Sequence, residues 1–266
     1  MLIRIIIAMI AFAGNSVLCR LALKGMHADA ISFSSIRLIS GAIALFLFIA
    51  ITSDSRKFEF KWLNALLLCI YVFSFSIAYV SLSTGAGALL LFGTVQLVMT
   101  VWGIAQGEKL VILKITGILG ALAGIAILLF PGVERPSFYA AIMMVIAGLA
   151  WAFYSITGKK ITDAAASTGG NFILAIPVAL IIPLFFRSHL HIDIYGLVLG
   201  VLSGAITSGG AYLLWYSLLP LLRSTTASTI QLSVPCRPLS VGSYFWAKRS
   251  PSESFSQASL FWLELA

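Results

Sequence analysis

Charged residues are scarce in this sequence of 266 residues, and acidic ones are the scarcest. Asp, Glu, Lys and Arg together make up 10% of the chain, whereas 60% of its residues are hydrophobic. A soluble domain carries about 25% charged residues and could not cover its surface with so few polar groups. The composition therefore argues strongly against a water-soluble enzyme and predicts a protein that crosses a membrane several times.

Cysteine is also rare, and its positions form no disulfide framework. Cys19 and Cys69 lie inside apolar runs, where a buried structural thiol is the expected role, and Cys236 is the third. The net charge of +8 arises from Lys and Arg residues that stand singly or in pairs at the ends of apolar runs. This distribution is typical of cytoplasmic loops and does not indicate a nucleic-acid partner.

Long apolar runs occupy most of the chain. Each run is continuous over about 20 residues, the length of a transmembrane helix, whereas barrel strands alternate over about 10 residues. The breaks between runs carry Gly, Pro and charged residues, which favour turns. The expected fold class is an all-α polytopic membrane protein. The nine runs lie near residues 2–22, 31–52, 62–82, 85–106, 112–131, 138–157, 169–187, 194–217 and 225–246.

The positions of the basic residues predict the orientation. With the N-terminus in the cytoplasm, the inside segments hold nine Lys and Arg residues and the outside segments hold four. Positive residues are enriched in cytoplasmic loops, so we expect a cytoplasmic N-terminus and a multi-pass protein of the bacterial inner membrane.

An internal repeat connects the two parts of the chain. Five spans separate the matching segments, and because five is odd, the two copies cross the membrane in opposite directions. Inverted repeats of this kind are typical of secondary transporters, which bind substrate near the midplane between the two halves. The matches are Thr94–Leu97 with Thr229–Leu232, Ser81–Leu82 with Ser217–Leu218, and Phe12–Ser16 with Trp151–Ser155.

The chain resembles the drug/metabolite transporter superfamily of the EamA type. The resemblance rests on Asn15–Arg20, on Arg37 within Ser35–Leu38, on the small residues before Thr94–Leu97, on Gly107-Glu108 and on Ala227–Pro235. It implies ten helices arranged as two inverted repeats of five helices. The first repeat is expected over residues 1–132 and an incomplete second repeat over residues 138–235.

The tail, residues 236–266, departs from this pattern, with seven Ser residues and no continuous apolar span. Reading its back-translated codons two bases later permits GEAITERKFLASVVILVGIG, which aligns without gaps to residues 107–126 of the first repeat. We therefore hypothesise a frameshift near Cys236, which replaces the end of helix nine and helix ten. The alternative is a natural, divergent C-terminus, and the coding DNA distinguishes the two.

Polar side chains within the spans are the first candidates for substrate contacts, because such groups are costly in a bilayer core. Asn15 could hydrogen-bond substrate or join two helices. Arg37 could bind an anion or carboxylate, or it could snorkel to the outer interface or pair with helix C-termini. Gln96 and Gln231 occupy equivalent repeat positions, which favours a place in the lining of a cavity.

Aromatic residues are the second group of candidates. Tyr79, Trp151, Tyr154 and Tyr212 could form one wall of a substrate cavity. Trp215 and Tyr216 lie where a span is expected to end, so an interfacial belt is the favoured location for both.

Several kinds of site lack the residues they need. No carboxylate lies within the first eight spans, so the sequence gives no support for proton coupling there. Glu108 could pair with Lys109, and it or a histidine could still serve in proton coupling, but a solvated turn is the favoured location for Glu108. His189 and His191 form an H-x-H pair in a loop without further ligands, so no metal site is expected. The chain has no Walker loop, and we expect no cofactor.

Together, these features and the resemblance predict a secondary-active inner-membrane transporter, an exporter by resemblance. The expected substrate is a small organic metabolite, such as an amino acid or a related amphiphile. The expected surroundings are the lipid bilayer and no nucleic acid, and a homodimer is compatible with the sequence. One alternative is an inactive truncated product. A membrane-embedded enzyme is disfavoured because the spans lack paired carboxylates, His clusters and Cys/His sets.

Overall fold

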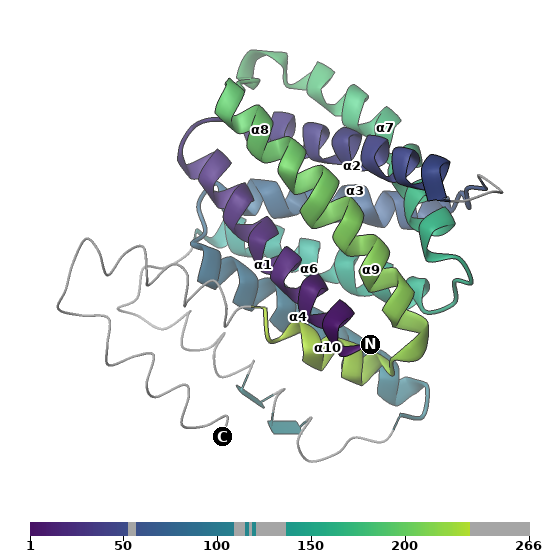
Figure 1. Ribbon diagram of the computed structural model, residues 1–266. Helices are drawn as coiled ribbons and strands as arrows, with labels where there is room; N and C mark the ends of the chain where they lie inside the picture. The colour runs from purple at the N-terminus through teal and green to yellow at the C-terminus, as the bar shows by residue number, and fades with distance from the viewer. Residues whose placement is uncertain (53–56, 109–114, 117–118, 121–136, 235–266) are drawn as a thin grey trace.

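Helices joined by short connections make up the part that the computed structural model describes, which comprises residues 1–52, 57–108, 115–116, 119–120 and 137–234 (Figure 1). Seven helical segments in this part are long and apolar enough to cross a membrane. The all-α polytopic fold class is confirmed. The helices are α1 (Leu2–Lys24), α2 (Ala30–Thr52), α3 (Trp62–Tyr79), α4 (Thr84–Ala105), α6 (Phe138–Gly158), α7 (Ala164–Phe185), α8 (Ile194–Leu202), α9 (Ala211–Leu218) and α10 (Ser224–Gln231).

Short polar residues fix where several helices begin. The hydroxyls of Ser83 and Ser137 accept hydrogen bonds from the first turns of α4 and α6. The carboxylates of Asp163 and Asp193 do the same for α7 and α8. Such caps satisfy backbone N–H groups that have no partner within the helix. Because of the Asp163 cap, α7 begins at Ala164, before the apolar run that the sequence shows from residue 169.

The eighth span is continuous from Ile194 to Leu221, and its middle is the π-helical segment η2 (Ser203–Gly210). Glycines in this region allow η2 to lie directly against α2. A Cβ atom at Gly204 would collide with the Arg37 carbonyl oxygen and the Ser40 hydroxyl. Gly200 and Gly204 are four residues apart, a spacing of small residues that allows such close helix packing.

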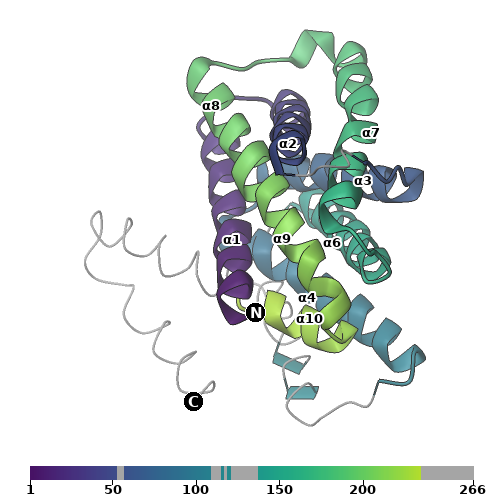
Figure 2. The same ribbon diagram turned by 45° about the vertical axis from the view of Figure 1, so that its right-hand side comes forward.

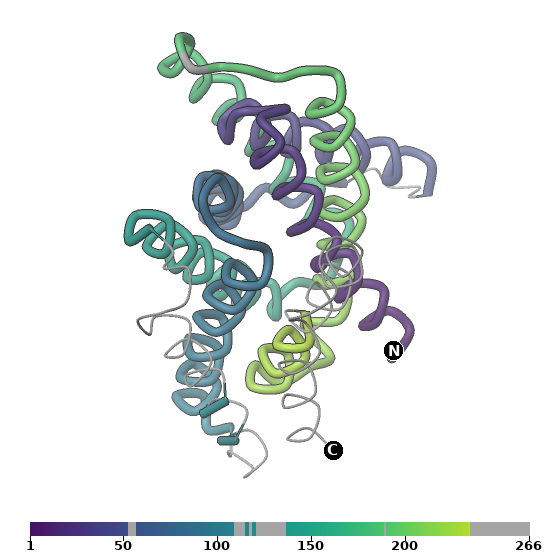
Figure 3. Tube along the Cα trace, turned by 90° about the vertical axis from the view of Figure 1, so that its left-hand side faces the viewer, coloured from purple at the N-terminus to yellow at the C-terminus, as the bar shows by residue number. Residues whose placement is uncertain are grey.

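The helices of the two expected repeats are interleaved. α2 packs against α7, and α4 packs against α10. In each pair the two helices occupy equivalent positions in the two repeats. α1 lies beside α8 and α9, as Figure 2 shows, and α3 packs against α6 in the equivalent contact. The tube view in Figure 3 shows α4 and α10 together at the end of the molecule away from α2. This arrangement fits the inverted-repeat transporter fold.

Side-chain contacts also correspond between the two repeats. Ser155 Oγ accepts a hydrogen bond from Trp215 Nε1 at 3.2 Å. At the positions that the repeat makes equivalent, Ser16 hydrogen-bonds with the Tyr79 hydroxyl.

The predicted span 112–131 and tail 236–266 lie outside the described residues, as does most of the predicted ninth span beyond α10. The hypothesis of a frameshift therefore stays a prediction.

Candidate functional site

Arg37 lies at the centre of the bundle and is completely buried. Its Nε donates a hydrogen bond to Ser208 Oγ at 2.7 Å, and its Nη2 donates to the hydroxyls of Tyr212 and Tyr71, the latter at 3.3 Å. The guanidinium also lies over the rings of Tyr71 and Phe75, 5.3 and 5.1 Å from their centroids. Arg37 is held inside the protein, so the snorkelling alternative is wrong.

The charge of Arg37 has no counter-ion among the described residues. Its Nη1 also has no hydrogen-bond partner there. Burying an unpaired cation costs several kcal/mol, which neutral hydrogen bonds and contacts with aromatic rings offset only in part. An anionic group beside Arg37 would lower this cost. The acidic residues of the described part all lie outside the helices; they are Asp29, Glu59, Glu108, Asp163 and Asp193.

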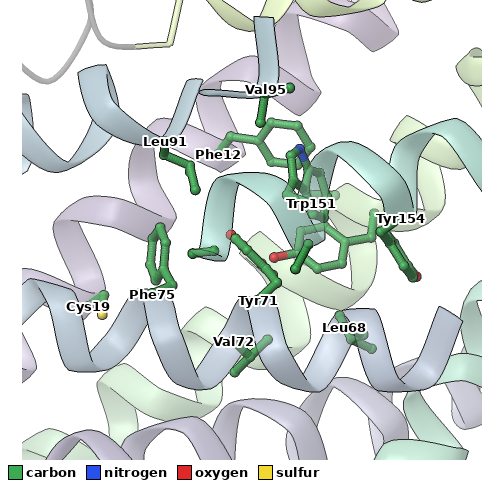
Figure 4. Packing of buried hydrophobic residues seen from close by; sticks show 14 of the residues in the cluster. Phe12, Cys19, Leu68, Tyr71, Val72, Phe75, Leu91, Val95, Trp151 and Tyr154 are labelled. Atoms are coloured by element: carbon green, nitrogen blue, oxygen red, sulfur yellow. The ribbon is translucent and has the colours of Figure 1, made fainter. Parts of the chain in front are cut away.

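Trp151 connects Arg37's aromatic neighbours across four helices. Its ring centroid lies 5.4 Å from Phe12, 4.9 Å from Tyr71 and 4.7 Å from Tyr212, which belong to α1, α3 and α9. Figure 4 shows Trp151 between Phe12 and Tyr71, with Tyr154 beside it. The rings form an aromatic cluster next to the buried cation. We use "aromatic cluster" for Phe12, Tyr71, Phe75, Trp151 and Tyr212.

Asn15 connects α1 to the π-helical segment. Its Oδ1 accepts hydrogen bonds from Ser203 Oγ at 2.7 Å and from Thr207 Oγ1 at 3.2 Å. This contact is the helix–helix role that the sequence left open. Asn15 still lies one helical turn from Phe12, so it belongs to the border of the aromatic cluster.

The two glutamines that the repeat makes equivalent have different surroundings. Gln231 Oε1 accepts a hydrogen bond from Trp151 Nε1 at 2.6 Å. Gln96 is fully buried, and neither of its amide atoms has a partner among the described residues. The repeat places Phe12 where the second half has Trp151, and a phenyl ring has no N–H group to donate. Trp151 thus donates a hydrogen bond to Gln231 Oε1, whereas Phe12, its counterpart in the first repeat, has no donor to offer Gln96.

The remaining aromatic candidates separate into two groups. Tyr154 lies beside Trp151, with ring centroids 5.6 Å apart, and its hydroxyl accepts a hydrogen bond from Asn171 at 3.3 Å. Tyr79 is the last residue of α3, and its only ring contact among the described residues is with Phe75. The structure therefore brings Arg37, Trp151, Tyr154 and Tyr212 together and leaves Tyr79 at the border.

The expectation that Trp215 and Tyr216 form an interfacial belt is wrong. Both side chains are fully buried, because the span continues to Leu221 instead of ending near residue 217. Trp215 donates to Ser155, and the Tyr216 hydroxyl donates to the Tyr154 carbonyl oxygen at 2.9 Å. These bonds satisfy the polar atoms of two rings that are otherwise packed in the core.

Glu108 is also not in a solvated turn. Its carboxylate accepts hydrogen bonds from Ser224 N at 2.8 Å, Thr225 N at 3.1 Å and Thr225 Oγ1 at 2.8 Å. It therefore caps α10 from a distant part of the chain, and its ion-pair partner is Lys159 Nζ, at 3.6 Å. Burial opposes ionisation, but these hydrogen bonds and the nearby Lys159 outweigh it and lower the pKa of Glu108 to about 2.

A second cluster joins the segment that follows α1 to the segment that precedes α8. Ala28 and Ile192 form an antiparallel β-bridge, and Asp29 Oδ2 accepts a hydrogen bond from the His191 backbone N–H at 2.7 Å. The ring of His27 lies 2.7 Å from Asp193 Oδ2. The N–H of the α8 first turn and this imidazole lower the pKa of Asp193. No group of three metal-ligating residues occurs in the described part.

The sequence did not single out Tyr71, Phe75 or Ser208 as site residues. Tyr71 and Phe75 are one turn apart on α3, so they present one face to α2. Such a pair in an apolar helix is also typical of ordinary core packing, and this is why the pattern alone could not identify it. Ser208 is one of many small residues in a glycine-rich segment, and only the fold shows that it meets Arg37.

Comparisons with known proteins agree with this architecture. Residues 138–255 match the EamA-like transporter family, and the match continues beyond Pro235 into the tail. The chain is 42% identical over 231 residues to "Uncharacterized protein PA1977" of Pseudomonas aeruginosa, a match that covers 86% of this chain and 80% of that protein. A solved structure titled "Crystal structure of protein" is similar in fold, with a TM-score of 0.68 and 14% identity, covering 96% of this chain and 92% of that one.

Proposed function

The chain belongs to the EamA-like transporter family of membrane proteins, and we propose that it is a secondary-active exporter in the inner membrane. The proposed substrate is a small organic metabolite, such as an amino acid or a related amphiphile. Transport proceeds by alternating access between the two inverted repeats, residues 1–132 and 138–235.

The observation that carries this proposal is the centre around Arg37 and the aromatic cluster. Both repeats contribute to it, since Arg37 and Tyr71 come from the first and Trp151, Ser208 and Tyr212 from the second. Inverted-repeat transporters bind substrate near the midplane, at the interface of the two halves. A buried cation beside aromatic rings is a suitable environment for an amphiphile that carries a negative group.

Two clusters at opposite ends of the bundle support alternating access. At one end Glu108 of the first repeat holds Lys159 and the start of α10 in the second; we call this the Glu108 latch. At the other end the 27–29 segment of the first repeat pairs with the 191–193 segment of the second; we call this the outer clasp.

The predicted orientation places the Glu108 latch at the cytoplasmic face and the outer clasp at the opposite face. In the described conformation both are closed, and Arg37 is shielded from both sides. A rocking motion of the two halves would open one cluster while the other holds.

Efflux from cells tests the proposal. Cells that express the chain are loaded with a panel of amino acids and related acids, and release is compared with an empty-vector strain. A version with the restored reading frame is measured beside it. Faster release of at least one compound by either version supports the exporter. Activity in the frame-restored version alone identifies this chain as an inactive truncated product. No difference from empty vector for any compound refutes the proposal.

A further inference from the structure

We propose that the group recognised beside Arg37 is a carboxylate, and that the substrate needs no ammonium group for recognition. This inference rests on the proposed function and deepens it by naming the substrate class, which is organic carboxylates with an apolar body. Amino acids are accepted through their carboxylate, and organic cations of the same shape are excluded.

The first argument is the balance of charge. Arg37 carries a permanent positive charge at a position with no exposed surface. Its hydrogen-bond partners, Ser208, Tyr71 and Tyr212, are all neutral. The described residues supply no carboxylate to it, and no acidic residue of the whole sequence lies within the first eight predicted spans. An anionic substrate would supply the missing negative charge.

The second argument is the free hydrogen-bonding capacity of the guanidinium. Nε and Nη2 are used by the three hydroxyl partners, which fix the orientation of the group. Nη1 is buried and has no partner among the described residues. Leaving buried N–H groups unpaired is costly. A carboxylate oxygen is the acceptor that a guanidinium binds most strongly, and it would satisfy the remaining N–H groups.

The third argument is the absence of a site for an ammonium group. A carboxylate would be the usual partner for such a group, and the described helices contain none. A cation in this place would instead be repelled by Arg37, at short range and in a medium of low dielectric constant. The cluster therefore distinguishes substrates by charge.

The aromatic cluster favours substrates whose body is flat and apolar. Phe12, Trp151 and Tyr212 lie in mutual ring contact with centroids 4.7 to 5.9 Å apart. These rings contact one another in the closed conformation and would contact a flat apolar body when the halves separate. Aromatic rings prefer edge-to-face or offset contacts of this kind with a flat partner.

A purely structural role for Arg37 is the competing explanation. In that case its hydrogen bonds would only hold α2, α3 and α9 together, and the chemistry of the substrate would not depend on it. The experiment must therefore vary the charge of the substrate with the protein unchanged. It must also vary the residue at position 37 with the substrate unchanged.

The experiment is counterflow of labelled 3-phenylpropionate in proteoliposomes containing the full chain or its frame-restored version, whichever is active in cells. The unlabelled competitors are 3-phenylpropionate, phenylalanine, the neutral 3-phenylpropionamide and the cationic phenethylamine, which share one apolar body. The variants are Arg37→Gln and Arg37→Lys, with Arg4→Gln as control. Arg4 is exposed at the start of α1, and its change removes the same charge.

We expect both acids to compete, the amide to compete at least tenfold more weakly, and phenethylamine not to compete. Arg37→Gln should weaken both acids at least tenfold, Arg37→Lys should restore part of this loss because it keeps the charge, and Arg4→Gln should have no effect. Thermal unfolding of each variant shows whether it is folded. A variant that does not fold leaves the competitor series in wild type as the deciding measurement.

Phenethylamine competing as well as 3-phenylpropionate overturns the inference, as does a folded Arg37→Gln with unchanged affinity for acids. Absence of counterflow with any acid overturns it as well. The cell efflux panel separates these failures from failure of the proposed function. Export of neutral or cationic metabolites would leave the transporter proposal standing and refute the carboxylate alone.

Discussion

Replacing Glu108 by Gln tests whether its carboxylate holds the two halves together. The substitution keeps the size of the side chain and one carbonyl oxygen but removes the negative charge. That charge faces Lys159 and the backbone N–H groups at the start of α10. The start of a helix carries a partial positive charge. Removing the negative charge of Glu108 therefore weakens its interactions with Lys159 and with the start of α10 at the same time.

The pKa of Glu108 gives the size of the effect. A carboxyl pKa that falls from about 4.5 to about 2 corresponds to about 3 kcal/mol of preference for the ionised form. The side chain is 13% exposed, so solvent screens these interactions only weakly. Glutamine keeps part of the hydrogen bonding, so we expect Glu108→Gln to lower the free energy of unfolding by about 1–3 kcal/mol.

Thermal unfolding in detergent measures the effect, with Glu59→Gln as the matched control. Glu59 pairs with Lys61 at 3.1 Å, but both side chains are at least one-third exposed. An exposed pair contributes less than about 1 kcal/mol, so the control should unfold close to wild type. At neutral pH the Glu108 variant should unfold several degrees lower.

The pH dependence gives a second, independent check. Because folding lowers the pKa of Glu108, its contribution is fully present above about pH 4.5 and is lost as the pH falls towards 2. The difference between wild type and Glu108→Gln should therefore be constant from pH 7 to 5 and shrink below that range. Equal unfolding temperatures of wild type and Glu108→Gln at pH 7 would refute the proposed latch.

Three further predictions concern other contacts. Trp151→Phe should lower stability by about 1–3 kcal/mol, because it leaves the buried Gln231 Oε1 without its donor; thermal unfolding checks this, and adding Gln231→Leu should recover part of the loss. Gly204→Ala should sharply reduce the yield of folded protein, because its Cβ would collide with α2, whereas Gly14→Ala, whose Cβ has space, should fold normally. Asp193→Asn should weaken the outer clasp, so a single cysteine introduced at Thr207, with the native cysteines replaced, should react faster with a membrane-impermeant thiol reagent from the outer face.

Much of the fold could be predicted because a bilayer imposes a simple rule. A helix must be apolar over about 20 residues, and the runs of such residues locate α1 to α4 and α6 to α8 closely. Exact boundaries depend on local caps, as at Asp163, where a polar turn extends the helix beyond its apolar run. The π-helical turn of η2 leaves no comparable pattern in composition.

The site was predictable where a residue was chemically exceptional. Arg37 is conspicuous in an apolar helix, Trp151 was one of the aromatic candidates, and the repeat pointed to Gln96 and Gln231. By contrast, Tyr71 is an ordinary core residue in sequence, and only tertiary packing brings it to Arg37. Glu108 illustrates the same limit, since Ser224 and Thr225, whose backbone N–H groups donate to it, lie more than 100 residues away along the chain.

The central claim is that one buried site opens alternately to the two faces of the membrane. A single cysteine at Thr207, beside the site in η2, tests this in a background in which Cys19, Cys69 and Cys236 are replaced. Membrane-impermeant thiol reagents are applied to each face in turn, with and without Glu108→Gln. We expect reaction from both faces, with the variant faster from the cytoplasm and slower from outside. Reaction from neither face, or from the same single face in every variant, would contradict alternating access.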